Sequence, residues 1–423
     1  MSQQFGELLD PYRTLKEPLG IKGNRQSVVI NNNPSTIDQN QTLTVRFPNL
    51  GKHDVIVPGT ARLAFNVELE SDADPNRTVV PNLGRSIIQN ITVKIEGREV
   101  LSLNEANIFL NYCDLWLTEN QRKDRIYQGI QAANGLKHRI NAGDKTDNSK
   151  DKTVASIFKN RFCVPLEFEL LNTHLPFYPG ALSERLSYEL RFNRYDQVVL
   201  TSDPEAKYKI SNISLEFDLV NHIELARMVL NRYQSQLPIY YQRVLHHSTQ
   251  SKNKSDTIWN FSFSTTGRSI KGVLMLFKEK NEPFQHEPEK FFNPKINHLT
   301  CTIEGSPNQI YANGLLPYHH FEEARKFFGC VDQTKTGQIC KDFHLHDLRL
   351  EDFYMKKYGL WLDLRTTDDN KLHGSGRRIE GSDGLVIQIE KEAGSNKEMN
   401  VYIFVVYDAQ LNIAENRLKD IVF

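Results

Sequence analysis

The sequence predicts an all-β chain built as two tandem eight-stranded jelly rolls, with short inserted helices and long loops. The first observation is an internal repeat: residues 91–97 (ITVKIEG) recur as residues 299–305 (LTCTIEG) in a chain of 423 residues. The second is that apolar and polar residues alternate along many short segments, which is typical of half-buried strands. The third is that turn-forming residues interrupt these segments at short intervals, as in sandwiches and barrels.

Matched strands flank both copies of the repeat. Residues 63–69 (LAFNVEL) precede the first copy, and residues 272–277 (GVLMLF) precede the second. Near the end of each half lie residues 213–220 and residues 399–406, which are again strand-like. Strands that recur in the same order favour a duplicated domain over a chance match between short β-like strings.

Chain length also favours two domains, because single hydrophobic cores stop growing beyond about 250–300 residues. We assign residues 1–26, which are polar with scattered proline and glycine, to an extended N-terminal arm. Residues 27–235 form the first predicted jelly roll, and residues 236–423 form the second. Each half then has room for the strands of one jelly roll together with insertions.

Individual strands follow from the alternation, which turns one face to a core and the other to water or a partner. We predict strands at residues 166–170, 186–192, 360–364 and 385–389. Residues 401–406 (VYIFVV) differ, because they are apolar on both faces. A strand of that kind is covered twice, so we expect the neighbouring domain or another subunit to lie against it.

One helix is predicted after the first copy of the repeat. Residues 102–105 (SLNE) match a capping box, which marks a helix start. Apolar residues then follow at helical spacing: Ile108, Tyr112, Leu115 and Trp116. The matching helix of the second half, residues 321–328, is shorter. Residues 129–152 form a long polar loop, which is expected to be an exposed projection.

Composition excludes several classes of protein. Lysine plus arginine and aspartate plus glutamate both number 52, so the formal net charge is zero. A nucleic-acid-binding protein usually carries a basic excess, so no direct sequence-specific nucleic-acid binding is predicted. No apolar run approaches the roughly 20 residues of a transmembrane helix. The five cysteines contain no Cys-x-x-Cys pair, which favours synthesis in a reducing compartment.

The strongest candidate for enzyme chemistry is a metal site at His344, His346 and Glu351. Two histidines two residues apart on a strand point the same way and can bind one metal. With Gly337 and Gly359, the spacing resembles the first cupin motif, so a metal-dependent bicupin enzyme is the alternative interpretation. The spacing misses that motif by one residue at both ends, and no second cupin motif follows. We therefore predict no catalytic, cofactor-binding or metal-binding residues.

The remaining candidates have simpler explanations. The pairs His246–His247 and His319–His320 adjoin a loop and a helix start, and are interpreted as surface or capping features. Arg377–Arg378 is interpreted as a solvated turn. The sequence contains no P-loop, dinucleotide fingerprint or Gly-x-Ser-x-Gly motif. A carbohydrate-binding β-sandwich is a third interpretation, but the loop at residues 129–152 has no aromatic residue to stack on a sugar.

Three stretches carry a resemblance to a known family. They are residues 165–190, which include PLEFELL and HLPFYP, residues 240–247 (YYQRVLHH) and residues 372–379 (LHGSGRRI). In these stretches, and diffusely from residue 27 to residue 423, the chain resembles the double jelly-roll major capsid proteins of polintons and adintoviruses. That group is related in fold to adenovirus hexon and to the capsid proteins of virophages and giant viruses.

The resemblance implies a structural role, no cofactor and no enzyme activity. Three copies would form a homotrimer whose six jelly rolls make a pseudo-hexameric capsomer. Capsomers would pack into an icosahedral shell, with penton and minor capsid proteins as further partners, so the protein would be found in the virion capsid. The arm at residues 1–26 would reach beneath the shell or to a neighbouring subunit.

Overall fold

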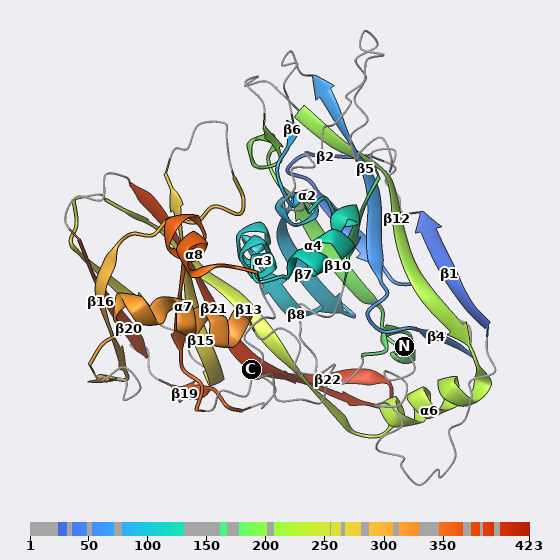
Figure 1. The fold of residues 1–423 in the computed structure, drawn as a ribbon. Coiled ribbons are helices and arrows are strands. Elements are labelled where there is room, and N and C mark those ends of the chain that lie inside the picture. The colour runs from blue at the N-terminus through green and yellow to red at the C-terminus, as the bar shows by residue number, and fades with distance from the viewer. Residues whose placement is uncertain are drawn as a thin grey trace.

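The computed structural model contains two β-sandwiches that lie side by side (Figure 1). It describes residues 24–31, 36–48, 53–71, 78–130, 161–166, 177–200, 207–253, 255–263, 267–280, 287–307, 313–329, 347–366, 374–380, 384–392 and 398–423. The strands of the first sandwich precede those of the second along the chain, and helix α6 (Ile223–Gln234) lies between them.

The first sandwich contains strands β1 to β12. Its larger sheet runs in the order β1-β12-β5-β9, and β2 and β4 also pair with β12. Its smaller sheet runs β3-β10-β7-β8, while β6 pairs with β11. These strands are β1 (Asn24–Asn31), β2 (Thr36–Asp38), β3 (Thr42–Arg46), β4 (Asp54–Ile56), β5 (Arg62–Ser71), β6 (Thr78–Val79), β7 (Ile88–Ile95), β8 (Arg98–Leu103), β9 (Arg161–Pro165), β10 (Leu186–Phe192), β11 (Val199–Leu200) and β12 (Lys207–Asn221).

The second sandwich contains strands β13 to β22. Its larger sheet runs β13-β21-β15-β18, and its smaller sheet runs β14-β20-β16-β17. Strands β19 and β22 pair with β15 and β21. These strands are β13 (Leu237–Lys252), β14 (Ile258–Phe263), β15 (Gly267–Glu279), β16 (Ile296–Ile303), β17 (Ser306–Pro307), β18 (Gly359–Asp363), β19 (Arg377–Ile379), β20 (Leu385–Lys391), β21 (Met399–Ala414) and β22 (Arg417–Val422).

The two sandwiches share one strand order. When the strands on these four sheet paths are counted along each half, both larger sheets read first-eighth-third-sixth. Both smaller sheets read second-seventh-fourth-fifth. The pairs are antiparallel, as in β12–β5 and its equivalent β21–β15. Eight antiparallel strands in two packed sheets form a jelly roll, so the predicted fold of two tandem jelly rolls is confirmed.

The sequence repeat marks the same hairpin turn in both halves. Glu96 and Gly97 follow β7 with φ values of 47° and 79°, and Glu304 and Gly305 follow β16 with 49° and 76°. Positive φ at both central residues is the geometry of a type I′ turn, which matches the twist of the strands it joins. The backbone N–H groups of Glu96 and Glu304 also make equivalent bonds, to the residues that precede β10 and β20.

Helices fill the connections between strands. They are α2 (Leu83–Ser86), α3 (Ala106–Asp114), α4 (Glu119–Asp124), α7 (His320–Phe328) and α8 (Leu350–Lys356), besides α6. Helices α3 and α7 follow the equivalent strands β8 and β17, so the helix predicted after each copy of the repeat is confirmed. No helix within the described ranges is long and apolar enough to cross a membrane.

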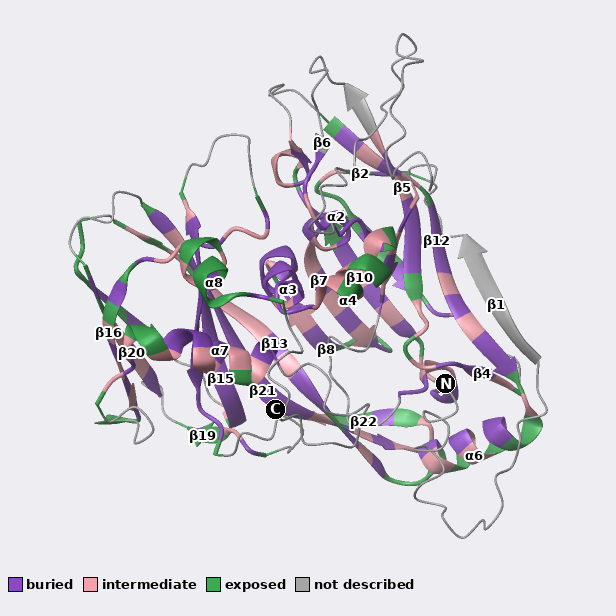
Figure 2. Cartoon of the chain, in the orientation of Figure 1, coloured by how far each residue is buried: buried purple, intermediate pink, exposed green. Residues whose placement is uncertain are grey.

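The larger sheet of the second jelly roll is buried on both faces, as its purple central strands show (Figure 2). Leu274 of β15 lies opposite Phe404 of β21 and Trp361 of β18, so these three side chains share one face. Their neighbours Val273, Val405 and Leu362 share the other face, and all six are buried. The double covering predicted for residues 401–406 is confirmed.

The capping box predicted at residues 102–105 is wrong. Ser102 belongs to β8, and α3 begins after Glu105, which has a φ of 53° and makes no side-chain capping bond. A capping box does form at the next helix, α4, where Thr118 and Gln121 bond reciprocally. The strand takes Ser102 because the hairpin pairs it with Thr92 of β7.

One predicted boundary differs from the structure, and two predictions fall on residues outside the described part. Strand β1 begins at Asn24, so it includes the last residues of the segment assigned to the arm, and residues 1–23 lie outside the described part. Strand β9 ends at Pro165, and residues 167–170 of the strand predicted at 166–170 lie outside the described residues. The loop expected at residues 129–152 falls outside the described residues from position 131 onward.

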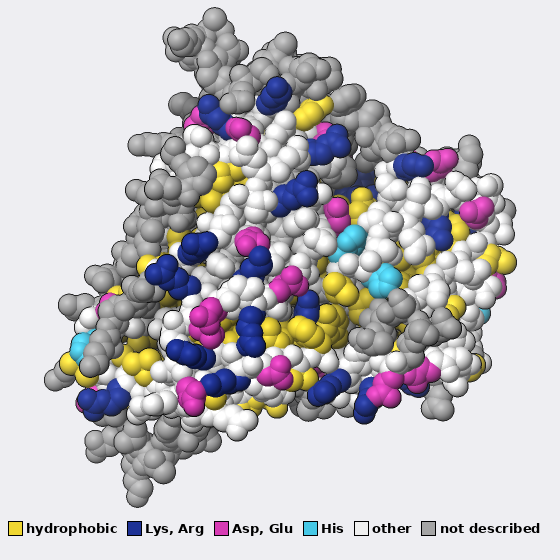
Figure 3. All heavy atoms as spheres, turned by 180° about the vertical axis from the view of Figure 1, so that it is seen from behind, with side chains coloured by type: hydrophobic (Ala, Val, Ile, Leu, Met, Phe, Trp, Pro, Cys, Tyr) yellow, Lys and Arg dark blue, Asp and Glu magenta, His cyan; other side chains and the backbone are white. Residues whose placement is uncertain are grey.

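Charges are mixed on the face of the molecule seen from behind. Figure 3 shows basic and acidic side chains interspersed, together with a band of hydrophobic side chains bordered by histidine. On this face no single sign of charge dominates, which agrees with the equal numbers of acidic and basic residues. Exposed apolar side chains that lie together are typical of surfaces that contact other proteins.

Candidate assembly surfaces

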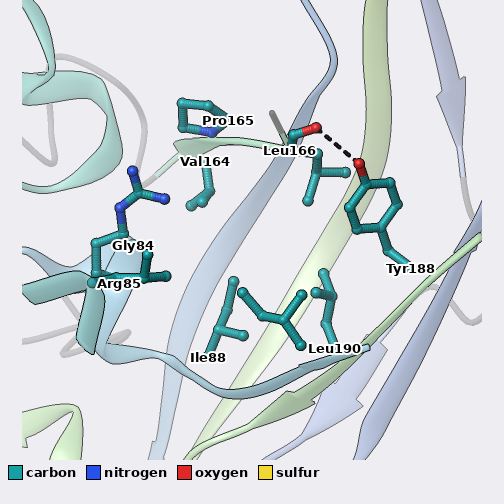
Figure 4. Close-up of a pocket in the computed structure, with 10 residues that line it drawn as sticks. Gly84, Arg85, Ile88, Val164, Pro165, Leu166, Tyr188 and Leu190 are labelled. Carbon is teal, nitrogen blue, oxygen red and sulfur yellow. Dashed lines mark hydrogen bonds between the residues drawn. The ribbon is translucent and has the colours of Figure 1, made fainter. Parts of the chain in front are cut away.

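The first jelly roll encloses a small cavity of about 10 Å³ (Figure 4). It is lined mainly by apolar side chains such as Ile88, Val164 and Leu190. The Tyr188 hydroxyl at its edge donates a hydrogen bond to the Leu166 carbonyl at 3.3 Å. Such a space holds about one water molecule, whereas ligand pockets usually measure about 300 Å³ or more. This cavity therefore offers no substrate site.

The residues proposed as metal ligands do not form a site in the described structure. Glu351 lies in the first turn of α8, where its side chain is exposed. His344 and His346 lie outside the described residues. Within the described ranges, no three histidine, cysteine, aspartate or glutamate side chains gather closely enough to hold a metal ion.

Helix α3 joins the two jelly rolls. It lies on the outer face of the sheet β13-β21-β15-β18, which is the face turned away from that jelly roll's own core. The Phe109 ring of α3 lies 5.3 Å from the Phe404 ring of β21. Beyond it, Tyr112 packs edge-on against Phe328 of α7 at 5.1 Å, and Trp116 stacks on Phe321 at 5.7 Å. We call this contact between α3, α7 and the outer sheet face the seam.

Two glycines make room for the large rings of the seam. A Cβ atom on Gly359 of β18 would lie 2.5 Å from the Tyr112 ring. A Cβ atom on Gly272 of β15 would lie 2.4 Å from the Trp361 ring. On its other side Trp361 stacks on Phe327 of α7, with ring centroids 4.2 Å apart. The seam is thus packed as tightly as a protein interior, where an extra methyl group has no space.

Polar contacts hold the edges of the seam. Both terminal carboxylate oxygens of Glu289 accept bonds from Arg122 of α4, at 2.6 and 2.7 Å. Arg98 of β8 donates to the Leu418 carbonyl of β22 at 2.8 Å. Hydrogen bonds between charged partners are stronger than neutral ones, so the Arg122–Glu289 pair adds a polar contact between the two jelly rolls.

The equivalent outer face of the first jelly roll is polar. On strands β5, β9 and β12, Glu216 accepts from Arg62 at 3.2 Å and from Arg161 at 3.4 Å. Lys209 and Glu68 form a further pair at 3.8 Å. These side chains are partly exposed, whereas Phe404 and Leu274 are fully buried at the same strands of the second jelly roll. The two equivalent faces therefore have different surroundings within one chain.

Helix α8 and the neighbouring 3-10 helix η7 (Pro317–His319) carry exposed apolar side chains. Tyr318 and Met355 are each 67% exposed, and Leu350 is 56% exposed. Tyr354 of α8 ties the two elements together, because its hydroxyl donates to the Pro317 carbonyl and accepts from the Phe321 N–H. Exposed apolar groups on one surface are typical of a protein contact.

The stretch at residues 372–379 contacts a buried ion pair. Lys271 is fully buried, with its Nζ 3.0 Å from Oδ1 of Asp408. The other carboxylate oxygen accepts from the Ser269 hydroxyl at 2.7 Å and from the Gly374 N–H at 2.9 Å. A Cβ atom on Gly376 would lie 2.6 Å from neighbouring backbone. The Gly-Ser-Gly sequence therefore lets the chain pass close over the pair, and residues 372–373 lie outside the described part.

The interpretation of the histidine pairs as surface features is wrong for His320, which is only 1% exposed. Its Nδ1 lies 2.7 Å from the Tyr358 hydroxyl. Desolvation by burial lowers the pKa of His246 and of His247, which stand at a β-bulge in β13. Arg377 and Arg378 are exposed, but they lie in strand β19 rather than in a turn.

No family model matches the chain, and no curated protein sequence matches it. Its structure is similar to that of the PBCV-1 virus capsid, with a TM-score of 0.61 at 9% identity over 96% of this chain and 98% of that one. The Faustovirus major capsid protein gives 0.54 at 8% identity, over 96% of this chain and 94% of that one. The mavirus major capsid protein gives 0.50 at 10% identity, over 97% and 93%.

The chain has the double jelly-roll fold of these capsid proteins. Sequence reasoning identified that fold and the covering of residues 401–406, but it did not identify the seam. The signal that was present is the set of aromatic residues Tyr112 and Trp116, in and just after α3, and Phe321 to Phe328 in α7. Neither segment contains a local pattern that predicts its contact with the other.

Proposed function

We propose that this protein is a structural major capsid protein and that three copies form a pseudo-hexameric capsomer of an icosahedral shell. The observation that supports the proposal is the seam, considered together with the internal repeat. A helix of the first jelly roll covers the apolar face of the larger sheet in the second. The equivalent face of the first jelly roll carries partly exposed ion pairs.

A second copy of the chain fits that polar face. The seam joins unlike surfaces, and contacts of this heterologous kind close into rings when the rotation between units allows it. Helix α3 lies in the connection between the fifth and sixth strands of its jelly roll, and η7, α7 and α8 lie in the equivalent connection of the second. We infer that η7 and α8 of one copy contact β5, β9 and β12 of the next, so that three chains arrange six jelly rolls in one ring.

The finer assignments remain predictions. The division into jelly rolls at 27–235 and 236–423 is supported by a linking helix that ends at Gln234, whereas β1 begins at Asn24, within the arm assigned to residues 1–26. Penton and minor capsid proteins would complete the shell, and the protein would reside in the virion capsid. The resemblance to polinton and adintovirus capsid proteins is likewise proposed from the sequence.

The bicupin enzyme is not supported by a specific observation. Glu351 is exposed in the first turn of α8, and His344 and His346 lie outside the described residues. The cavity in the first jelly roll has space for about one water molecule. We therefore propose a protein that functions through its contacts with other copies and not through catalysis.

Light scattering on a sizing column tests the proposal directly. One chain has a mass of 48.9 kDa, so three chains give about 147 kDa. We expect a stable species of that mass, and electron microscopy of the same fraction should show particles with pseudo-hexagonal outlines. A monomer that carries stoichiometric iron, zinc or manganese would contradict the capsid proposal and favour the bicupin.

A further inference from the structure

Helix α7 contributes much of the aromatic packing in the seam, because it contacts both α3 and strand β18. On one side its Phe327 stacks on Trp361 of β18. On the other side its Phe328 packs against Tyr112 of α3, and its Phe321 stacks on Trp116. Motion of α7 away from the sheet therefore removes the aromatic contacts that α7 makes with Tyr112, Trp116 and Trp361, and so weakens the seam.

The first residue of this helix is a buried histidine. His320 is 1% exposed, and its ring lies edge-on to Tyr358, whose hydroxyl is 2.7 Å from Nδ1. Helix N-termini carry a partial positive charge, which disfavours a cation in the first turn. Desolvation by burial lowers the pKa of His320 to about 4, although the Leu315 backbone carbonyl acts in the opposite direction.

The groups around His320 do not supply a compensating negative charge. Tyr358 is fully buried, and its pKa is raised well above the usual value by burial, so it stays neutral. His319, the last residue of η7, lowers the pKa of His320 further. The two nearest carboxylates of α7, Glu322 and Glu323, form ion pairs with Arg325 and Lys326 on the helix surface. Tyr354 of α8 is uncharged as well, with a raised pKa.

We propose that His320 makes the seam acid-sensitive: protonation of this side chain displaces α7 and so loosens the contact between the two jelly rolls. The proposal goes beyond the capsid function and does not depend on it, because the seam lies within one chain. A charged ring at this position lacks both solvation and a counter-ion, so it is accommodated only when α7 moves toward solvent. The pH thus controls whether α7 covers the outer face of the larger sheet in the second jelly roll.

The sign of the effect follows from linkage. The pKa of His320 is lower in the closed state, about 4, than in an open state where the ring has its ordinary value of 6.5. The stability of the closed seam is then fully present above pH 6.5 and is lost as the pH falls from 6.5 toward 4. Between pH 7.5 and pH 5 the open population should rise about 30-fold from this residue alone.

Two other titratable groups border the seam and act in opposite directions. Burial lowers the pKa of His246, whose ring lies 5.3 Å from Phe404, so it also favours opening in acid. Burial raises the pKa of Glu105 at the start of α3, so its protonation favours the closed state. Only a variant of His320 separates its share from theirs.

Hydrogen exchange measured by mass spectrometry on the full-length protein tests the proposal. After correction for the intrinsic exchange rate, amides of α7 should open about 30-fold more often at pH 5 than at pH 7.5. His320→Gln keeps a neutral polar side chain next to Tyr358 and should remove most of that increase. His298→Gln is the matched control, because His298 bonds to the Asn313 carbonyl at the surface of β16 and should leave the increase unchanged.

Helix α6 serves as an internal reference, since it lies away from the seam and its exchange should not follow the same pH profile (Figure 1). The proposal is overturned if α7 of the wild-type protein is equally protected at both pH values. It is also overturned if His320→Gln retains the full increase. Should that variant fail to fold, His320→Asn takes its place, and retention of the full increase in that variant would likewise overturn the proposal.

Discussion

At the scale of single residues, the buried pair of Lys271 and Asp408 is the most demanding interaction of the second jelly roll. Moving two charges out of water is costly, and the pair repays that cost only when every remaining donor and acceptor is engaged. Here the carboxylate is held by the lysine, the Ser269 hydroxyl and the Gly374 N–H. This arrangement explains why small residues surround the pair.

Replacing Lys271 with methionine should destabilise the protein by about 3 kcal/mol, because it leaves Asp408 as an uncompensated buried charge. Urea unfolding followed by circular dichroism measures the change. Lys295→Met is a suitable control, since Lys295 pairs with Glu392 at a mostly exposed site and its loss should not be detectable. Adding Asp408→Leu to Lys271→Met should restore much of the lost stability, and a double variant no better than the single one would contradict this explanation.

Among the secondary-structure elements, the connection between the fifth and sixth strands makes different contacts in the two halves. In the first half it supplies α3, which covers the second jelly roll. In the second half it supplies α7, which is already packed in the seam, and α8, which leaves Leu350 and Met355 exposed. An equivalent element with an uncovered apolar surface is expected to bind an equivalent partner, and that partner is the first jelly roll of another copy.

Met355→Asp should therefore abolish the trimer without unfolding the chain. Met355 is 67% exposed, so a carboxylate there is solvated in the monomer but would lose its water in the contact. Light scattering should show a 48.9-kDa species with an unchanged melting temperature. Ile223→Asp, at an exposed position at the start of α6, is the control and should remain trimeric. A trimeric Met355→Asp variant would exclude α8 from the contact.

At the scale of the whole molecule, the two jelly rolls behave as one unit because the chain crosses between them more than once. The hairpin of β21 and β22 extends back to the first jelly roll, where the Asn416 carbonyl accepts the Ser183 N–H at 2.8 Å. The Leu418 N–H donates to Glu184 at 2.8 Å, and the Leu418 carbonyl accepts from Arg98. A half of the chain expressed alone would lose these contacts and expose the seam.

The N-terminal segment provides the test of assembly beyond the trimer. If residues 1–22 reach beneath the shell or to a neighbouring subunit, deleting them should leave the mass of the trimer unchanged but lower the yield of closed particles. Negative-stain particle counts from matched expression cultures measure the difference. An equal yield from the truncated and full-length chains would remove the arm from the assembly model.

Much of the fold was predictable because its signals are local. Period-2 alternation lies within a single strand, so β10, β18 and β20 follow from their own residues. The capping box failed for the same reason: the pattern at residues 102–105 is local, but pairing with β7 took Ser102 into a strand. The metal hypothesis rested on His344 and His346, and a tertiary arrangement around them is outside the described structure.

Local patterns are enough to predict a duplicated all-β chain whose residues 401–406 are covered on both faces, because repeats and periodicity can be recognised in neighbouring residues. The identity of the segments that cover these residues follows from the folded arrangement alone. The partners of the seam, such as Phe109 and Phe404, lie in different halves of the chain and share no local pattern. Beside them, Trp361 packs against Gly272 and Tyr112 against Gly359, and such a fit is a property of two surfaces rather than of either segment.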